Sequence, residues 1–143
     1  DRLPEGYLLH KDILDGRHLL AEVPSVPISL FQESSFIALR HGNDTRIRMD
    51  QICEQAGFTP HIQLEVDQLS TAYNIVRSGM GPTLVSDTLV RLAAPTEQTV
   101  FYKLDSSLNE RFAYFYYKSG IYQTLAMREF IRIAKECFPA ETE

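Results

Sequence analysis

Two short polar stretches carry side chains whose types and spacing suit the binding of a small ligand. The first is RHGNDT at residues 40–45, and the second is VDQLST at residues 66–71. Each follows an apolar run typical of a buried strand and leads into a helical pattern. The first N–H groups of a helix lack intrahelical partners and carry partial positive charge, so they favour carboxylates and phosphates. The candidate ligand-binding residues are Arg40, His41, Asn43, Thr45, Asp67, Gln68, Ser70 and Thr71.

The two stretches together favour a binding site more strongly than any of their residues does alone. Helix capping by itself accounts for Asp67, Ser70 or Thr71 taken one at a time. In an open parallel sheet, however, ligands lie beyond the carboxyl ends of the strands. Both stretches would open on that same edge. We therefore predict that they form one ligand site, with positive charge supplied by arginine and histidine side chains.

Motifs for catalysis or cofactor binding are absent from the sequence. It contains no GxSxG elbow, no Walker loop and no GxGxxG fingerprint. Gly-Met-Gly at 79–81 follows a helical pattern, which makes it a helix C-cap and turn rather than a phosphate-binding loop. The four histidines show no metal-ligand spacing with one another, with cysteine or with carboxylates. We therefore expect neither an enzyme nor a bound metal or other cofactor.

Alternating apolar and helical patterns predict the elements that position the two polar stretches. Strands and helices that succeed one another at short intervals indicate right-handed crossovers and a parallel sheet, and hence an α/β fold. The expected elements are a strand at 36–40, a helix from near Thr45 to Gly57 capped by Asn43 or Asp44, a strand at 61–66, a helix from its cap Asp67 to Gly79, and a strand at 82–86.

The remainder of the chain is less regular in its pattern. Pro24 and Pro27 indicate an extended connector, and residues 1–16 show only a weak strand or helix pattern. Further along, a short helix capped by Ser86 or Asp87 is expected at 86–94, strands at 100–104 and 111–118, and an amphipathic helix at 124–138. The side of that last helix predicted to be buried comprises Leu125, Met127, Phe130, Ile131, Ala134 and Phe138.

The composition fits one globular domain with a core, because 44% of the 143 residues are hydrophobic and 23% are charged. The net charge of -5 argues against a nucleic-acid surface on this chain. No apolar run reaches the roughly 20 residues that cross a membrane. We expect Cys53 and Cys137 to be free thiols on the apolar faces of two helices. The start at Asp1 indicates a fragment or a processed product.

The order of several longer motifs resembles the effector-binding domain of LysR-type transcriptional regulators. The resemblance covers roughly residues 17–138, and its first motif, HLLA, has Leu19 where the family has proline. No single motif is specific, whereas their order and spacing are. The motifs are HLLA at 18–21, SLFQESSFIAL at 29–39, QAGFTPHIQLEV at 55–66, AYNIVRSGMGPTLVSD at 72–87, RFAYFYYKSG at 111–120 and AMREFIRIAKE at 126–136.

This resemblance implies an α/β fold like that of the type II periplasmic binding proteins, with two lobes and a ligand cleft between them. Residues 1–24 would be a crossover and remnant of the first lobe, and 25–104 would be the parallel-sheet second lobe. Residues 105–143 would return to the first lobe and end in its C-terminal helix. The family's ligand-facing positions in the second lobe fall on 40–45 and 67–71.

The resemblance also implies a function. The expected partner is a small-molecule effector, a small organic acid or related metabolite, whose binding shifts the population of lobe arrangements. The full-length protein would be a cytoplasmic homodimer or higher oligomer that binds DNA only through an N-terminal domain outside these residues. No membrane association is expected. Because part of the first lobe would also lie outside them, we expect this fragment to bind effector weakly or not at all.

Two other functions are compatible with the sequence. A solute-binding protein of a transporter would share the fold, and an upstream signal peptide rather than a helix-turn-helix would identify it. A small α/β enzyme could use Asp67, His41 or Arg40 as acid, base or anion clamp, and turnover in a hydrolase or transferase screen would identify that.

Overall fold

The computed structural model describes residues 4–111, 114 and 116–137. The chain forms two compact units, Asp1–Glu110 and Arg111–Glu143. The first unit is mixed α/β with parallel strand pairs, which confirms the predicted fold class at that level. The assignment of 1–24, 25–104 and 105–143 to two lobes stays a prediction.

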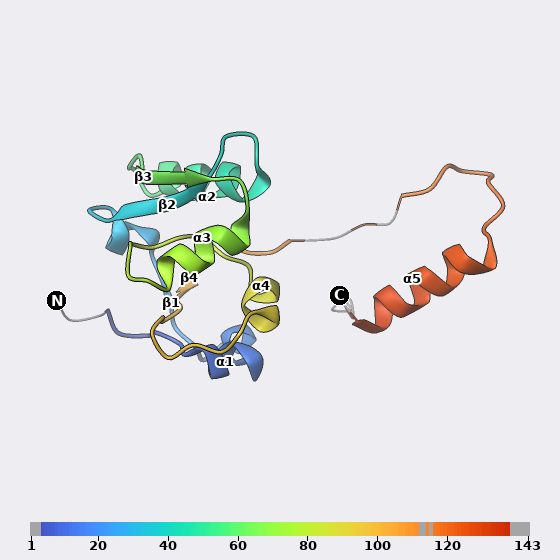
Figure 1. Ribbon diagram of the computed structural model, residues 1–143, viewed down its shortest axis with the longest axis horizontal. Coiled ribbons are helices and arrows are strands. Elements are labelled where there is room, and N and C mark those ends of the chain that lie inside the picture. Colours follow the sequence, from blue (N-terminus) through green and yellow to red (C-terminus); the bar gives the residue numbers. More distant parts are fainter. Residues whose placement is uncertain (1–3, 112–113, 115, 138–143) are drawn as a thin grey trace. The chain divides into compact units, whose positions relative to one another are not determined.

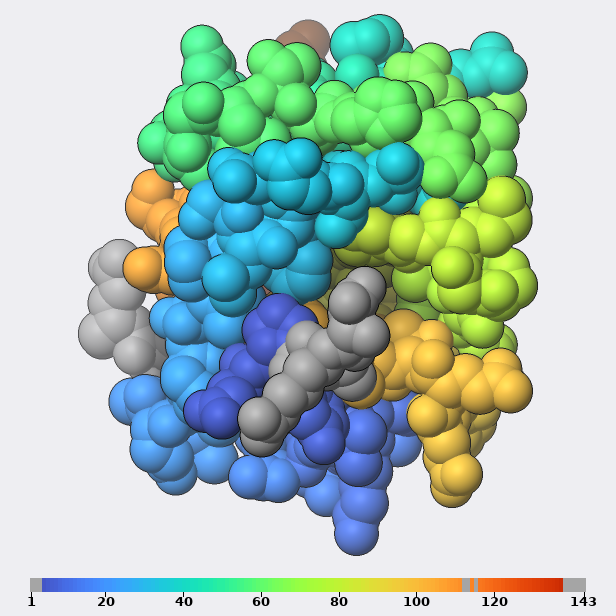
Figure 2. Space-filling view, turned by 90° about the vertical axis from the view of Figure 1, so that its left-hand side faces the viewer, coloured from blue at the N-terminus to red at the C-terminus, as the bar shows by residue number. Residues whose placement is uncertain are grey.

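The two longest strands of the first unit form a parallel pair. β2 (Ser35–Leu39) and β3 (His61–Val66) pair in parallel, and α2 (Asp44–Gln55) connects them. α3 (Leu69–Val76) follows β3. The two strands appear in Figure 2 as adjacent cyan and green bands. Because the pairing is parallel, the carboxyl ends of both strands meet at one edge of the sheet, as predicted.

The alternation of side chains along β2 explains why a helix covers each face of the sheet. Phe36 and Ala38 pack into the same cluster as the apolar residues of α2. Ile37 and Leu39 point the other way and pack with Ala72 of α3. Figure 1 shows α2 and α3 on opposite sides of the two strands. The continuous apolar sequence of β2 thus follows from burial on both faces.

A third apolar cluster joins α3 to the N-terminal segment and to residues near Val90. Tyr73 of α3 packs there with Leu8, Val90 and Phe101. Ser86 caps the helix that contains Val90 by accepting a hydrogen bond from the Leu89 N–H, as predicted. The remaining elements of the first unit are α1 (His10–Leu14), η1 (Arg17–Leu19), β1 (Ser25–Val26), η2 (Ile28–Phe31), α4 (Asp87–Leu92) and β4 (Lys103–Leu104), with β1 parallel to β4.

The third predicted strand, 82–86, is wrong. These residues are extended, but a single backbone hydrogen bond, from Ile37 N–H to the Pro82 carbonyl at 2.9 Å, joins them to β2. Pro82 has no N–H to donate, and Gly81 lies so close to β2 that a Cβ there would be 2.2 Å from the Ser35 oxygen. The chain therefore lies against β2 at this point and does not pair along it.

The strand predicted at 100–104 is confirmed only at its end, where β4 begins at Lys103. Phe101 instead exchanges two backbone hydrogen bonds, of 2.7 and 2.8 Å, with Leu8 in an antiparallel bridge. The N-terminal segment, whose pattern was weak, thus takes the pairing positions of the first half of the predicted strand. The connector predicted over residues 23–31 is extended only around the two prolines at 24 and 27, and the prediction is wrong for residues 28–31, which form the 3₁₀ helix η2.

The second unit contains α5 (Leu125–Cys137), which confirms the predicted final helix. Its predicted buried side is wrong for the described residues, because none of them is buried in this helix and Leu125 is 75% exposed. An amphipathic helix is buried only against another element, and α5 is the one regular element described in this unit. Of the strand predicted at 111–118, residues 112, 113 and 115 lie outside the described residues, as does Phe138, and the others are not in a strand.

Both cysteines are free thiols, as predicted. Cys53 is fully buried under β2, and burial raises the pKa of its thiol to about 11, so it is an inert core residue at neutral pH. Cys137 is exposed rather than on a packed face. Among the described residues, every helix is too short or too polar to cross a membrane.

Candidate functional site

The two predicted polar stretches lie next to each other at the carboxyl ends of β2 and β3. The Arg40 N–H donates a hydrogen bond of 3.1 Å to the Val66 carbonyl, which extends the strand pairing into the loops. Beyond it, the Arg40 Nε and an Asp67 carboxylate oxygen are 3.0 Å apart. Residues 40–45 and 67–71 are called the strand-end edge below. The juxtaposition predicted from sheet geometry is therefore present in the structure.

A buried arginine, Arg46, holds the ends of the two strands together at this edge. Arg46, whose side chain is only 7% exposed, donates through Nε to Asp50 and through Nη1 to the Leu39 carbonyl and to Glu65. Its Nη2 lies 3.2 Å from Nε2 of His41. The hydrogen bond from Arg46 holds the pKa of the Glu65 carboxyl below its ordinary value. Arg46 thus fixes the end of β2 to β3 and places His41 at the surface.

Asn43 and Thr45 build the start of α2. The Asn43 side-chain oxygen accepts a hydrogen bond of 2.9 Å from the Thr45 N–H, so Asn43 is the helix N-cap that the sequence predicted. Thr45 is buried, at 6% exposure. These two predicted site residues therefore shape the loop. Any contact of theirs with a ligand stays a prediction.

The start of α3 differs from the prediction in one respect. Asp67 does not cap this helix; Gln68 is the N-cap residue, and no described side chain bonds to the first turn. Asp67 instead forms an ion pair with Arg40, because its carboxylate bonds to the guanidinium and not to the backbone N–H groups of the first turn. Ser70 and Thr71 are exposed on the first turn. Ligand binding by these residues stays a prediction.

The strand-end edge is suited to reversible binding of an anion. The Arg40 side chain is 67% exposed and its partner Asp67 is 68% exposed, so their ion pair is solvated and weak. A ligand carboxylate can therefore compete with Asp67 for the Arg40 guanidinium. The described residues contain no cluster of three or more histidine, cysteine or acidic side chains placed to hold a metal ion.

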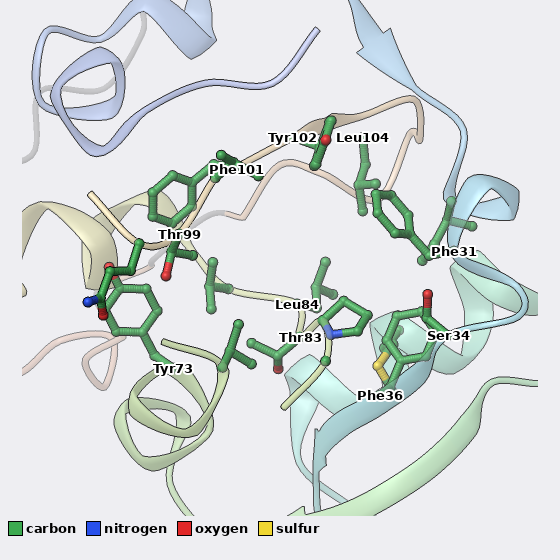
Figure 3. Close-up of a pocket in the computed structure, with 18 residues that line it drawn as sticks. Phe31, Ser34, Phe36, Tyr73, Thr83, Leu84, Thr99, Phe101, Tyr102 and Leu104 are labelled. Carbon is green, nitrogen blue, oxygen red and sulfur yellow. The ribbon is translucent and has the colours of Figure 1, made fainter. Parts of the chain in front are cut away.

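A cavity elsewhere in the first unit was missed by the sequence analysis. Its volume is about 410 Å³, and Figure 3 shows it between Phe31 and Phe36 at one end and Tyr73 and Phe101 at the other. Residues 82–85 and 98–102 also line it. Their apolar patterns predict strands, and a pair of ordinary strands would leave no such space, so no local sequence signal pointed to a cavity.

Comparisons with known proteins agree with one another. The family described as LysR substrate binding domain matches residues 13–139. The uncharacterized HTH-type transcriptional regulator YcgK of Bacillus subtilis (strain 168) is 26% identical over 113 residues, which are 79% of this chain and 34% of YcgK. The HTH-type transcriptional regulator XapR of Escherichia coli (strain K12) is 26% identical over 78 residues, 54% of this chain and 26% of XapR. The chain thus spans about a third of YcgK. No solved structure matches it significantly.

Proposed function

Because this chain belongs to the family of LysR substrate binding domains, the effector-sensing domains of transcriptional regulators, we propose that it binds its effector at the strand-end edge. The observation that supports this location is the joining of two separate loops by the Arg40–Asp67 ion pair and the Arg40–Val66 hydrogen bond. Ligand sites of open parallel sheets lie at such edges. The full protein would be a transcriptional regulator that binds DNA through a separate domain.

The chemistry of the edge supports a small organic acid as effector. Arg40 offers an exposed guanidinium, which recognises carboxylates through paired hydrogen bonds. The first turn of α3 adds exposed hydroxyls of Ser70 and Thr71 beside its uncapped amides. Asp67 sets the selectivity, because it competes with the ligand for Arg40 and so weakens the binding of anions that make no further contact.

The signal would pass through a shift in conformational populations. A ligand that takes Arg40 from Asp67 changes how the loops after β2 and β3 are held together. The proposed fold is that of the type II periplasmic binding proteins, in which a second lobe closes over the ligand. A ligand that binds the closed arrangement more tightly favours it, and a dimer of such domains transmits the change to the DNA-binding domains.

A titration followed by nuclear magnetic resonance tests the location of the site. Acetate, succinate and citrate are added in turn to the ¹⁵N-labelled chain, because this method detects even millimolar binding. We expect saturable shifts of the amide signals of residues 40–45 and 67–71. Ser70→Trp, on the exposed first turn of α3, should abolish these shifts. Ser78→Trp, exposed beyond the other end of the helix, should leave them unchanged.

The outcome that contradicts the proposal is equally specific. Shifts that map away from the strand-end edge, or that persist unchanged in Ser70→Trp, would place the anion elsewhere. Unfolding of Ser70→Trp is not expected, since the residue is exposed, and a circular dichroism spectrum like that of the wild type checks this.

A further inference from the structure

The cavity in the first unit is built from segments far apart in the chain. Residues of η2, the start of β2, the second half of α3, residues 81–85, residues 98–102 and Leu104 contribute to its lining. Most of its surface is apolar, with aromatic rings at both ends (Figure 3). Its volume of about 410 Å³ lies in the range of roughly 300–1,000 Å³ typical of small-molecule sites.

Two hydroxyl groups in this cavity are buried without a hydrogen-bond partner. They are the Tyr73 hydroxyl, on a residue only 2% exposed, and the Thr99 Oγ1 atom, and neither bonds to any part of the chain that the structure describes. Figure 3 places both residues at the same end of the cavity, next to Phe101. Buried polar groups are almost always paired in folded proteins. Two unpaired hydroxyls on residues at one end of a cavity are therefore available to a ligand that reaches that end.

The lining also restricts the charge of that ligand. None of the described residues that line the cavity is charged. A carboxylate or ammonium group placed inside would lose its hydration with no opposite charge in compensation. Burial raises the pKa of the Tyr73 hydroxyl, so this group is protonated at neutral pH and can donate a hydrogen bond. An uncharged ligand with an oxygen acceptor suits these conditions.

We propose that this cavity is a second ligand site, which takes a small uncharged ring compound whose one hydrogen-bonding group meets Tyr73 and Thr99. The ring occupies the apolar space toward Phe31 and Phe36. A dry cavity of about 150 Å³ lined by aliphatic and aromatic side chains already binds benzene, so the larger volume here accommodates a substituted ring. The site is separate from the strand-end edge, because none of residues 40–45 and 67–71 lines the cavity.

Three probes that share one ring test the proposal on the full chain. They are p-cresol, which is neutral and has a hydroxyl, toluene, which lacks it, and 4-methylbenzoate, which is charged. We expect p-cresol to bind about tenfold more tightly than toluene, as one hydrogen bond provides. Its amide shifts should fall on residues 81–85 and 98–104. The charged probe should cause no shifts there.

Matched variants identify the hydrogen-bonding groups. Tyr73→Phe should lower the affinity for p-cresol to that for toluene, and Thr99→Val should lower it severalfold. Tyr122→Phe is the control, because it removes the same group from a residue that is 77% exposed and does not line the cavity. That variant should bind p-cresol as the wild type does. Tyr73→Phe changes α3, whereas Thr99→Val changes a separate segment of the chain. A folding defect in one of these two variants therefore leaves the other informative.

Several results would overturn the proposal. They are equal affinity for p-cresol and toluene, wild-type affinity for p-cresol in both Tyr73→Phe and Thr99→Val, p-cresol shifts outside the cavity, or no binding at all. The proposed effector site is tested separately by the same titrations. Shifts of residues 40–45 and 67–71 with 4-methylbenzoate but none with p-cresol would support the strand-end edge and reject the cavity, whereas Ser70→Trp should leave p-cresol binding intact.

Discussion

The strand-end edge and the cavity are two candidate sites in one unit, and they solve opposite physical problems. At the edge, charged groups are exposed and already paired, as Arg40 and Asp67 show. In the cavity, most of the lining groups are apolar and half-buried or buried, and the two hydroxyls are unpaired. A ligand at the edge must therefore compete with the protein's own charges and with water. A ligand in the cavity meets little competition, but only an uncharged one enters without a large desolvation cost.

The two regions depend on different parts of the fold. The edge is fixed by short-range features, namely a helix cap, a strand end and the buried guanidinium of Arg46. The cavity depends on the position of residues 81–85, which begin close against β2 without pairing along it. The same kind of substitution should therefore change stability and ligand binding by different amounts in the two regions.

The largest difference in stability is expected between alanine substitutions of two glycines, one in each region. Gly81 has φ of +115°, and a Cβ there would meet the Ser35 backbone oxygen at 2.2 Å, so Gly81→Ala combines left-handed strain with a clash against immovable backbone. We expect a loss of about 3 kcal/mol in the free energy of unfolding, measured with urea, and loss of p-cresol binding. Gly42, at the edge, has φ of +88° but open space around it. Gly42→Ala should cost about 1 kcal/mol. Equal losses would show that residues 81–82 do not lie against β2.

Arginine substitutions within the edge should separate its anchor from its binding surface. Arg46→Ala removes a buried guanidinium with bonds to Asp50, Glu65 and a strand carbonyl, and we expect a loss of about 2–3 kcal/mol in urea unfolding. The figure is below that for fully buried pairs because both carboxylates are about 40% exposed. Arg40→Ala should cost less than about 1 kcal/mol, since its ion pair is exposed. It should nevertheless abolish the succinate shifts, and retention of those shifts would remove Arg40 from the proposed site.

The elements around the edge were predictable from the sequence because their signals are local. Asn43 before a helical pattern, and the apolar runs at 36–40 and 61–66, each determined an element without reference to the rest of the chain. The predicted strands at 82–86 and 100–104 depended on which neighbour would pair with them. Phe101 pairs with Leu8, and Pro82 has no N–H to donate in a strand at 82–86. Asp67 was misjudged for the same reason, since its partner Arg40 comes from another loop.

The cavity was not predictable because no single segment contains it. Tyr73 reads as an ordinary inward residue of α3, and its burial confirms that reading. That its hydroxyl lacks a partner depends on where residues 98–102 run, which the sequence of α3 does not determine. Unsatisfied buried polar groups become visible only when the packing of distant segments is known, whereas helix caps are visible in four consecutive residues.

The smallest expected difference is in the dependence of stability on pH. The hydrogen bond from Arg46 lowers the pKa of Glu65 in the folded chain. Stabilisation by this carboxylate is therefore complete above about pH 4.5, the ordinary glutamate value, and is lost as the pH falls through the lowered folded-state value. Glu65→Gln should make the free energy of unfolding fall less steeply than in the wild type over that range, as urea titrations at successive pH values would measure. Tyr73→Phe should keep the wild-type slope, because no carboxylate lines the cavity among the described residues. A slope unchanged by Glu65→Gln would mean that Arg46 is held by Asp50 and the Leu39 carbonyl alone, and that β3 contributes no charge to the edge.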